Sequence, residues 1–256
     1  MTSNTQFQKY LEKHFSEYSQ QEKTNYIRIN SDISRFDVWT EQVNQIKSIH
    51  NSIVLSSGCG SGGDLYYFLK KGAKKVYGIE TSKDLAFLAN KRLDIFNPKK
   101  FKIDVYDGAR LPYRDNTFDI VFSMHVIEHT HNPYQYLDEL IRVTKNEGII
   151  YIELPNKFYP IEQHTHQLFI QWIPKKIRKL LTDKKIFKRF YDLDHFLSPV
   201  NIYAYVKKNR NISIVDSNIH SYDGDTNHFK LPILSLHKLY KLFTKTSYKI
   251  VLQKSN

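Results

Sequence analysis

Short β-rich runs alternate with amphipathic helical segments between residues 50 and 155 of this 256-residue chain. The five runs are SIVLS, KKVYGIE, FKIDVY, FDIVFS and GIIYIELP. The residues between them carry helix start signals, such as Ser82 and Pro133. Strands separated by single helices at this interval predict a parallel sheet with helices on both faces. The alternation therefore predicts an α/β fold.

The regular alternation ends after Pro155. Residues 156–196 are longer than a simple crossover helix and predict an inserted helical cap after the fifth strand. A helix starting at Ser198 and Pro199 follows, and the runs NISIVDSNI and TSYKIVLQ then predict two further strands. We therefore expect a mostly parallel seven-stranded sheet in a single domain over residues 1–256.

The rest of the sequence predicts a polar N-terminal segment and a cytoplasmic location. Residues 1–50 predict a helical lead-in, in which Ser34 suits the N-cap of a helix that reaches Ile46. Cys59 is the only cysteine, which excludes an internal disulfide and favours a cytoplasmic setting. The N-terminus lacks the apolar core of a signal peptide, and no apolar run approaches the roughly 18 residues that span a bilayer.

The basic charge of the chain is concentrated in its C-terminal part. Residues 157–256 contain 18 Lys and Arg against 7 Asp and Glu, and the segment 174–190 contains 8 against 1. Its apolar residues fall near one side of a helix, which favours peripheral contact with the anionic inner face of a membrane. A solvated helix with its apolar stripe in the core would give the same pattern. Nucleic acid fits less well, because no recognised binding module accompanies the charge.

A glycine cluster, Gly58 to Gly63, follows the first predicted strand and precedes a helix. Glycines at such a place permit positive φ and let the backbone approach a ligand at the helix N-terminus. Glu80, at the end of the second predicted strand, suits the hydroxyls of a ribose. The spacing of Gly58, Gly60 and Gly63 also satisfies the dinucleotide fingerprint, so these residues alone leave a nicotinamide cofactor open.

An acid after the third predicted strand separates the two cofactors. Asp107 suits the exocyclic amine of an adenine, because a carboxylate accepts a hydrogen bond from an N–H₂ donor. A nicotinamide dehydrogenase gives no reason for this acid, nor for the run LPY…TFDIVFS that follows it.

Taken in order, the glycine loop, Glu80, Asp107, LPY, TFDIVFS and VIEH resemble the class I S-adenosylmethionine-dependent methyltransferases of the ubiquinone/menaquinone-biosynthesis type. The resemblance covers roughly residues 50–155. It implies a Rossmann-like fold whose last strand is antiparallel, and S-adenosylmethionine as the cofactor. The cofactor-binding residues that it implies are Gly58, Cys59, Gly60, Gly62, Glu80, Thr81, Asp107, Gly108, Ala109 and Ser123.

One position departs from the pattern of this family. Ser56 stands where the family usually has an acid that helps to position the ammonium group of the cofactor. A non-catalytic protein of the same fold is therefore the alternative that the sequence leaves open.

The chemistry of methyl transfer points to residues after the fourth predicted strand. A sulfonium is already an activated methyl donor, but a hydroxyl acceptor of high pKa also needs a base. The candidate catalytic residues are His129, His125, Glu128 and His164. Local capping of the turn before Pro133 is the alternative role of Glu128 and His129.

A metal site is a second interpretation of the same histidines. His125, Glu128 and His129, completed by His164 or His166, would resemble the divalent-metal arrangement of some RNA 3′-end 2′-O-methyltransferases. Their E-x-x-E-H motif is matched only in part, since His125 replaces its first acid. The main expectation is an enzyme without a metal.

The segment ELPNKFYPIEQHTHQLFIQWIP resembles the segment after strand five in methyltransferases of surface-glycan and natural-product synthesis. We expect acceptor contacts from Tyr159, Glu162, His164 and Trp172, although aromatic residues there also suit the packing of a lid. The predicted activity is O-methylation of a sugar, lipid-linked or secondary-metabolite hydroxyl, with transfer to nitrogen or carbon left open.

Overall fold

The computed structural model describes residues 19–21, 24, 30–106, 108, 110–161, 167–174, 177, 180, 197–220, 243 and 245–255. The chain divides into two compact units, Met1–Gly108 and Ala109–Asn256. Across the chain, seven strands follow the order β3-β2-β1-β4-β5-β7-β6. The single domain expected over residues 1–256 stays a prediction.

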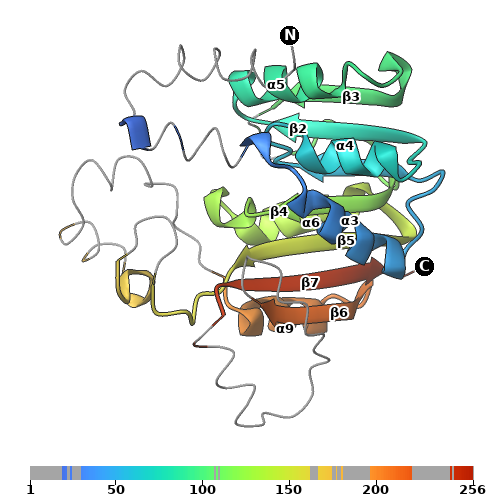
Figure 1. Ribbon diagram of the computed structural model, residues 1–256. Helices are drawn as coiled ribbons and strands as arrows, with labels where there is room; N and C mark the ends of the chain where they lie inside the picture. The colour runs from blue at the N-terminus through green and yellow to red at the C-terminus, as the bar shows by residue number, and fades with distance from the viewer. Residues whose placement is uncertain are drawn as a thin grey trace. The chain divides into compact units, whose positions relative to one another are not determined.

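The first unit contains three parallel strands. These are β1 (Ile53–Ser57), β2 (Lys75–Glu80) and β3 (Phe101–Val105), with β2 between the other two. The helices that lie wholly within the described residues of this unit include α3 (Arg35–Ile46), α4 (Gly63–Lys70) and α5 (Lys83–Leu93), and a short 3-10 turn, η1 (Pro98–Lys100), precedes β3. Helix α4 packs against β1 and β2, and α5 packs against β2 and β3 (Figure 1). The fully buried Leu55, Leu65 and Phe68 join strand and helix in one core.

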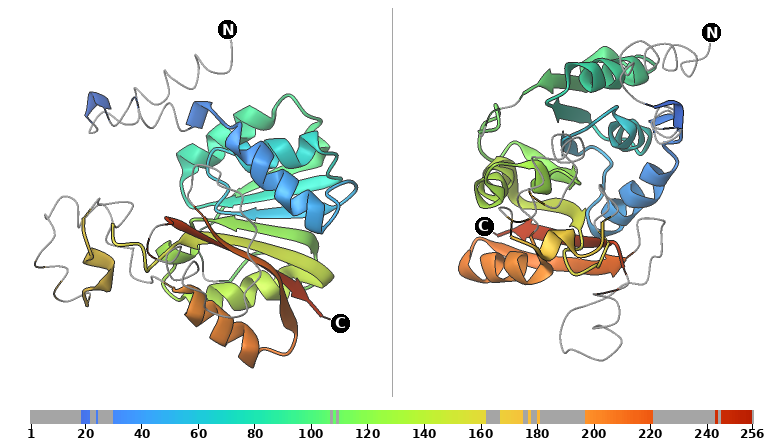
Figure 2. Two further views of the ribbon diagram at one scale, coloured as in Figure 1. Left: turned by 60° about the horizontal axis from the view of Figure 1, so that its bottom comes forward. Right: turned by 90° about the vertical axis from the view of Figure 1, so that its left-hand side faces the viewer.

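The second unit contains four strands, of which one runs against its neighbours. Strands β4 (Phe118–Met124) and β5 (Thr144–Pro155) are parallel, and β7 (Ser247–Lys254) is antiparallel to both β5 and β6 (Ile212–His220). Helix α6 (Pro133–Val143) packs against β5, and α9 (Pro199–Lys208) packs against β6 (Figure 2). The described part of this unit also contains two short 3-10 turns, η2 (Ile127–His129) and η3 (Ile170–Trp172).

The α/β fold predicted from the sequence is confirmed. Residues Gly148 to Pro155 of β5 are all buried, as expected for a strand covered on both faces. Phe122 of β4 and Tyr151 of β5 stack with ring centroids 4.9 Å apart. The last strand, β7, is antiparallel, as the resemblance implied.

Three predicted helix starts have the expected capping geometry. Ser82 accepts a hydrogen bond from the backbone N–H of Leu85, and Pro133 occupies the first turn of α6. Ser198 forms a capping box with Asn201 at the start of α9. Ser34 precedes α3 as predicted, but its side chain makes no capping bond, because its backbone is already helical and its hydroxyl donates to Asp32.

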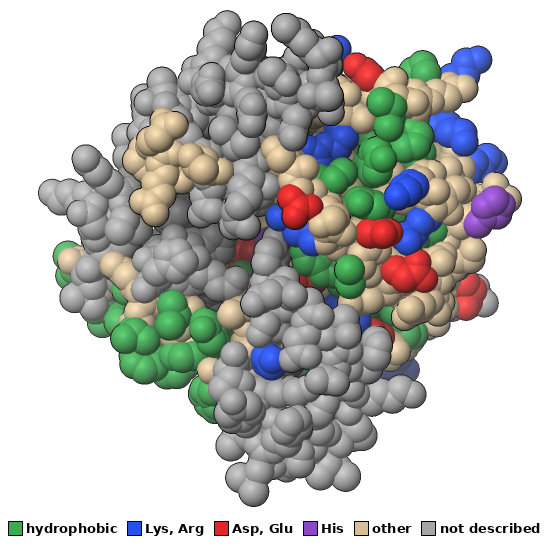
Figure 3. Space-filling model, in the orientation of Figure 1, with side chains coloured by type: hydrophobic (Ala, Val, Ile, Leu, Met, Phe, Trp, Pro, Cys, Tyr) green, Lys and Arg blue, Asp and Glu red, His purple; other side chains and the backbone are tan. Residues whose placement is uncertain are grey.

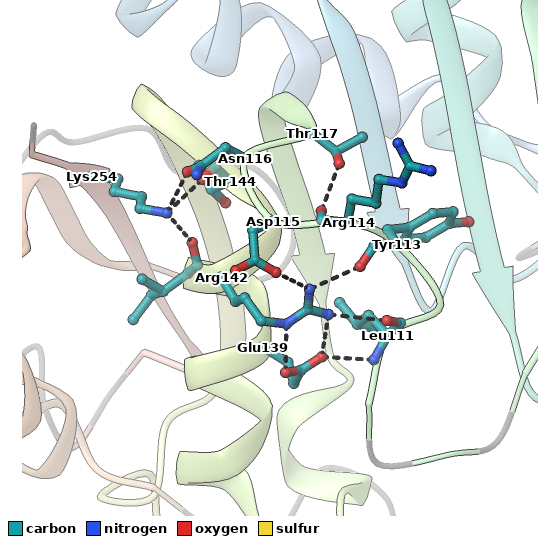
Figure 4. Close-up of polar contacts among 11 residues, drawn as sticks. Leu111, Tyr113, Arg114, Asp115, Asn116, Thr117, Glu139, Arg142, Thr144 and Lys254 are labelled. Carbon is teal, nitrogen blue, oxygen red and sulfur yellow. Dashed lines mark hydrogen bonds and ion pairs between the residues drawn. The ribbon is translucent and has the colours of Figure 1, made fainter.

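The LPYRDNT loop before β4 is held by Arg142 of α6 (Figure 4). The guanidinium donates to the carbonyl oxygens of Leu111 and Tyr113 at 3.0 and 2.8 Å. It also pairs with the carboxylates of Glu139 and Asp115, each at 2.7 Å. This sequence run, which the family resemblance singled out, therefore has a structural role in the second unit.

Most of the predicted helical cap over residues 156–196 lies outside the described residues. Within the described part, Ile161 pairs with Leu168 in an isolated antiparallel bridge, and η3 follows. No helix among the described residues is both long and apolar enough to cross a membrane.

Candidate functional site

The glycine loop of the first unit joins β1 to α4. Gly58, Gly60 and Gly62 have φ values of 73°, 51° and 76°, which lie in the left-handed region that favours glycine. The N–H groups of Gly58 and Cys59 both donate to the carbonyl oxygen of Ile79 at 2.9 Å, which ties the loop to β2. A Cβ at Gly60 would meet no atom of the described residues within 4 Å. The loop therefore leaves open space beside Gly60.

Glu80 closes the loop from the end of β2. Its Oε2 accepts a hydrogen bond from the N–H of Gly60 at 2.9 Å, and its Oε1 accepts from the N–H of Ser82 at 3.0 Å. The hydroxyl of Thr81 donates to the same Oε1 at 3.3 Å. Because two carboxylate oxygens offer about four acceptor positions and three are used, Glu80 retains about one position for a hydroxyl of a ligand.

The sequence analysis missed a second carboxylate at this loop. Asp64, in the first turn of α4, accepts hydrogen bonds from the hydroxyl of Ser56 and from the N–H of Leu65. Asp64 is 3% exposed and Ser56 is 1% exposed, so the pair is buried. Burial raises the pKa of Asp64 to about 6, against the lowering effect of its hydrogen bonds. In the sequence, the position of Asp64 directly after the glycine run is the feature that could have predicted its place at the loop.

Cys59 is buried in the same loop, and its thiol is not reactive. Burial, followed by the charges of Asp64 and Glu80, raises the pKa of its thiol well above the usual value. The thiol stays protonated at neutral pH, so Cys59 contributes its backbone rather than a nucleophile.

The lead-in segment packs directly on the glycine loop. A Cβ at Gly63 would lie 2.5 Å from the ring of Phe36, so only glycine fits there. The hydroxyl of Ser61 donates to the side chain of Asn30 at 3.0 Å, and Arg92 donates to the Asn30 carbonyl at 2.6 Å. The described part of the lead-in thus belongs to the surroundings of the loop.

The structure describes two of the four remaining residues that were predicted to bind the cofactor. Gly108 is exposed, whereas Asp107 and Ala109 lie outside the described residues. Ser123, in the second unit, is 1% exposed and shares a hydrogen bond of 2.9 Å with the hydroxyl of Tyr136. The roles of these four residues stay predictions.

The second unit contains a buried charge cluster at the end of β4. His125 has a φ of 52°, and its backbone N–H donates to the carbonyl oxygen of Glu153 at 2.8 Å. Its Nδ1 lies 3.5 Å from Oε1 of Glu128, and its Nε2 lies 3.7 Å from Oε1 of Glu153. The side chain of His125 is 20% exposed, while those of Glu128 and Glu153 are 2% and 0% exposed. Tyr151 donates to Oε2 of Glu153 at 3.2 Å.

Electrostatics in this cluster favour a protonated histidine. Burial by itself lowers the pKa of His125, but the neighbouring Glu128 and Glu153 raise it to about 10. At pH 7 the ring is therefore an imidazolium between two carboxylates. Neither carboxylate oxygen of Glu128 has a hydrogen-bond partner among the described residues. Burial, together with the charge of Glu153, raises the pKa of Tyr151 well above its usual value.

Of the four predicted catalytic residues, the structure brings together His125 and Glu128. His129 is exposed, and His164 lies outside the described residues. Glu153 and Tyr151 were missed. Glu153 is charged and stands in an otherwise apolar run, and that was the only signal for it in the sequence.

The described residues do not support the interpretation of a metal site. Among them, no group of His, Cys, Asp and Glu side chains is arranged to hold a metal ion. His164 and His166, which would complete the predicted ligand set, lie outside them.

The predicted acceptor residues include one exposed aromatic side chain. Trp172 is 44% exposed, donates from its indole to the carbonyl oxygen of Lys157 at 2.6 Å, and packs on Phe169 with ring centroids 4.9 Å apart. Tyr159 is half-buried, and Glu162 lies outside the described residues. In the view of Figure 3, hydrophobic side chains gather in separate groups at the lower left and the upper right.

The basic segment 174–190 lies mostly outside the described residues. Within it, Ile177 and Leu180 are described and are 50% and 84% exposed. Contact with an anionic membrane stays a prediction.

Comparison with known proteins fits the geometry of the loop. A family model described as a methyltransferase domain matches residues 55–152. Over this stretch the chain is therefore similar to methyltransferase domains. The match begins in β1 and ends in β5, so it includes the glycine loop, Glu80 and His125.

The proteins that this chain resembles include both O- and N-methyltransferases. Over 210 residues, 76% of this chain and 61% of the relative, the chain is 25% identical to the mitochondrial ubiquinone biosynthesis O-methyltransferase of Dictyostelium discoideum. Over 100 residues, 39% of this chain and 34% of the relative, it is 32% identical to ajmaline N-methyltransferase of Rauvolfia serpentina. The chain spans between 31% and 61% of the length of the curated relatives that it matches.

A solved structure supports the fold over a larger part of the chain. The S-adenosylmethionine-dependent methyltransferase from Mesorhizobium loti aligns with a TM-score of 0.59 and 12% identity, covering 84% of this chain and 97% of that protein. At this identity the likeness shows the fold alone.

The match to the methyltransferase family model implies S-adenosylmethionine as the cofactor, and the residues of the first unit fit it. The open space beside Gly60 admits a ligand against the loop backbone. The carboxylate of Glu80 is fixed at the edge of that space by the N–H of Gly60.

Proposed function

We propose that this chain is an S-adenosylmethionine-dependent methyltransferase that binds its cofactor with the glycine loop and Glu80. The observation that carries the proposal is the 2.9 Å hydrogen bond from the N–H of Gly60 to the Glu80 carboxylate, beside a loop without side chains at Gly58, Gly60 and Gly62. The methyltransferase-domain match over residues 55–152 supports the same assignment.

When bound, S-adenosylmethionine supplies a methyl group activated by a sulfonium. The loop backbone would approach the amino-acid part, and Glu80 would accept a hydrogen bond from a ribose hydroxyl. The protein contributes alignment, because an activated donor needs an acceptor held in line with the methyl group.

The acceptor that we propose is a hydroxyl of a sugar, a lipid-linked compound or a secondary metabolite. Such a hydroxyl must lose its proton, and the cluster of His125, Glu128 and Glu153 offers a place for it. One imidazolium and two carboxylates carry one net negative charge, so the cluster accepts one proton as a unit. His125, at 20% exposed, is its most accessible member, and Glu128 is the member whose carboxylate would receive the proton.

This arrangement assigns His125 a role other than that of a free base. With a pKa raised to about 10, the ring is already protonated at neutral pH. An imidazolium has no lone pair with which to take a proton from the acceptor, so Glu128, whose Oε1 lies 3.5 Å from Nδ1, would take that proton directly beside the positive charge of the ring. Conversion of Glu128 to Gln should therefore slow methyl transfer, while cofactor binding stays unchanged.

Calorimetry with S-adenosylhomocysteine tests the cofactor assignment. Binding should be measurable for the wild type and should weaken by about tenfold or more in Glu80→Gln, since hydrogen bonds to a charged group are lost. Glu147→Gln, an exposed acid on β5, is the matched control and should bind as the wild type does. Failure of the wild type to bind would overturn the proposal, and binding of NAD in its place would favour an oxidoreductase.

Transfer of a labelled methyl group to a panel of hydroxyl and amine compounds tests the acceptor class. We expect products from hydroxyl acceptors, and a rate that falls in Glu128→Gln. Products from amines alone would exclude O-methylation. A wild type that binds S-adenosylhomocysteine but methylates nothing in the panel would favour a non-catalytic protein of this fold.

A further inference from the structure

The glycine loop has a second carboxylate whose position the hydrogen bonds of the first unit define. Asp64 extends from the first turn of α4 towards the end of β1, where the hydroxyl of Ser56 donates to its Oδ2. The N–H of Leu65 donates to its Oδ1 at 2.8 Å. Both oxygens are thus oriented, and the carboxylate lies on the side of the loop that faces β1.

Among the described residues, no Lys, Arg or His side chain forms an ion pair with the buried carboxylate of Asp64. Arg92 acts on Asp64 through its charge, but its guanidinium donates to the carbonyl oxygen of Asn30 at 2.6 Å. Removal of an acid from water is costly unless a positive group compensates it. A ligand with an ammonium group would supply that compensation.

The cofactor of the proposed function has such a group, because S-adenosylmethionine ends in an amino acid with an ammonium and a carboxylate. Glu80 is engaged with the N–H groups of Gly60 and Ser82 at the end of β2, where it suits the ribose. Asp64 lies next to the loop on the side of β1 and is the remaining acid of the loop region.

We propose that Asp64, oriented by Ser56, supplies the counter-charge for the ammonium group of the cofactor. The inference rests on the proposed function. Strand β1, with the sequence IVLSS, contains no acidic residue, so the negative charge comes from Asp64 of α4 instead. Ser56 is then the residue that holds Asp64 in place, rather than a defect of the cofactor site.

Two related ligands separate this role from a purely structural one. S-Adenosylhomocysteine contains the amino acid, whereas 5′-methylthioadenosine has the same nucleoside and thioether without it. In calorimetry, Asp64→Asn should weaken S-adenosylhomocysteine about 10- to 100-fold, the cost of losing a charge-assisted contact, and should leave 5′-methylthioadenosine nearly unchanged. Asp84→Asn, which changes the acid in the first turn of α5, is the matched control and should affect neither ligand.

An equal loss of affinity for both ligands would overturn the inference, because Asp64 would then only support the loop. If the wild type binds neither ligand, the proposed function itself fails, so the two failures are distinguishable.

A second measurement uses the wild type alone and does not depend on the folding of a variant. Burial raises the pKa of Asp64 to about 6, so the carboxylate takes up a proton as the pH falls from 7 to 5. The affinity for S-adenosylhomocysteine relative to 5′-methylthioadenosine should decline by up to about tenfold per pH unit below 6. A ratio that stays constant from pH 7 to pH 5 would also overturn the inference.

Discussion

The glycine loop of the first unit and the His125 cluster of the second both follow a parallel strand, yet they hold their polar groups differently. In the loop, Glu80 receives hydrogen bonds of 2.9 and 3.0 Å from backbone N–H groups. In the cluster, His125 lies 3.5 and 3.7 Å from two buried carboxylates. The loop is therefore fixed by short directional bonds, whereas the cluster is held mainly by charge.

This difference has an energetic consequence. Hydrogen bonds from backbone groups satisfy a carboxylate without a second buried charge. A buried imidazolium between two carboxylates depends on all three groups, because removal of one leaves the others poorly compensated. We therefore expect the cluster to respond strongly to single changes and to pH, and the loop to respond mainly to changes of its backbone.

The largest expected effect is that of Glu153→Gln, which removes one of the two charges beside His125. Glu153 is fully buried, so the free energy of unfolding at pH 7 should fall by about 3 kcal/mol, as for a broken buried ion pair. Urea denaturation measures this change. Glu147→Gln, at the exposed start of the same strand, should change the free energy of unfolding by less than about 0.5 kcal/mol. Equal effects of the two substitutions would show that charge does not hold the cluster together.

The next largest expected effect is a pH dependence of the free energy of unfolding that arises from His125. Its pKa is raised from 6.5 to about 10 in the folded protein, so its contribution to stability is fully present below pH 6.5 and is lost as the pH rises towards 10. Between pH 7 and pH 9 the wild type should lose roughly 1 kcal/mol per pH unit more than His125→Asn does. Asn suits the variant because it tolerates a positive φ.

Denaturation curves of both proteins at several pH values provide the comparison. Parallel pH profiles would mean that His125 is not held protonated by its neighbours, and the proton transfer to Glu128 proposed above would lose its basis.

The same contrast explains how far the sequence predicts the molecule. The loop is contiguous, and its partner Glu80 stands at the end of the next strand, so spacing along the chain predicts the contact between them. The antiparallel direction of β7 followed from the resemblance and is confirmed. The paired Ser56 and Asp64 were missed because their contact depends on how the first turn of α4 returns towards β1.

The cluster is predictable only in part, since it depends on strand pairing. His125 and Glu128 are neighbours in sequence, whereas Glu153 reaches His125 through the parallel register of β4 and β5, in which Met124 lies opposite Glu153. Lys249 adds a further buried charge from β7, opposite Glu153, and pairs with Asp216 at 2.7 Å. No short sequence pattern predicts such a contact, because the residues that form it are far apart in the chain.

The smallest expected effects are those of replacing two glycines of the loop by alanine, one at a time. Gly62→Ala combines a φ of 76° with a new Cβ that would lie 3.0 Å from that of Ala89, and should cost about 2 kcal/mol of stability. Gly60→Ala has the φ of 51° but meets no atom of the described residues within 4 Å, so about 1 kcal/mol is expected. For binding of S-adenosylhomocysteine the order should reverse, because the methyl group at position 60 enters the space beside Glu80. Thermal unfolding and calorimetry on both variants check the two orders, and a larger binding loss in Gly62→Ala would place the cofactor elsewhere than beside Gly60.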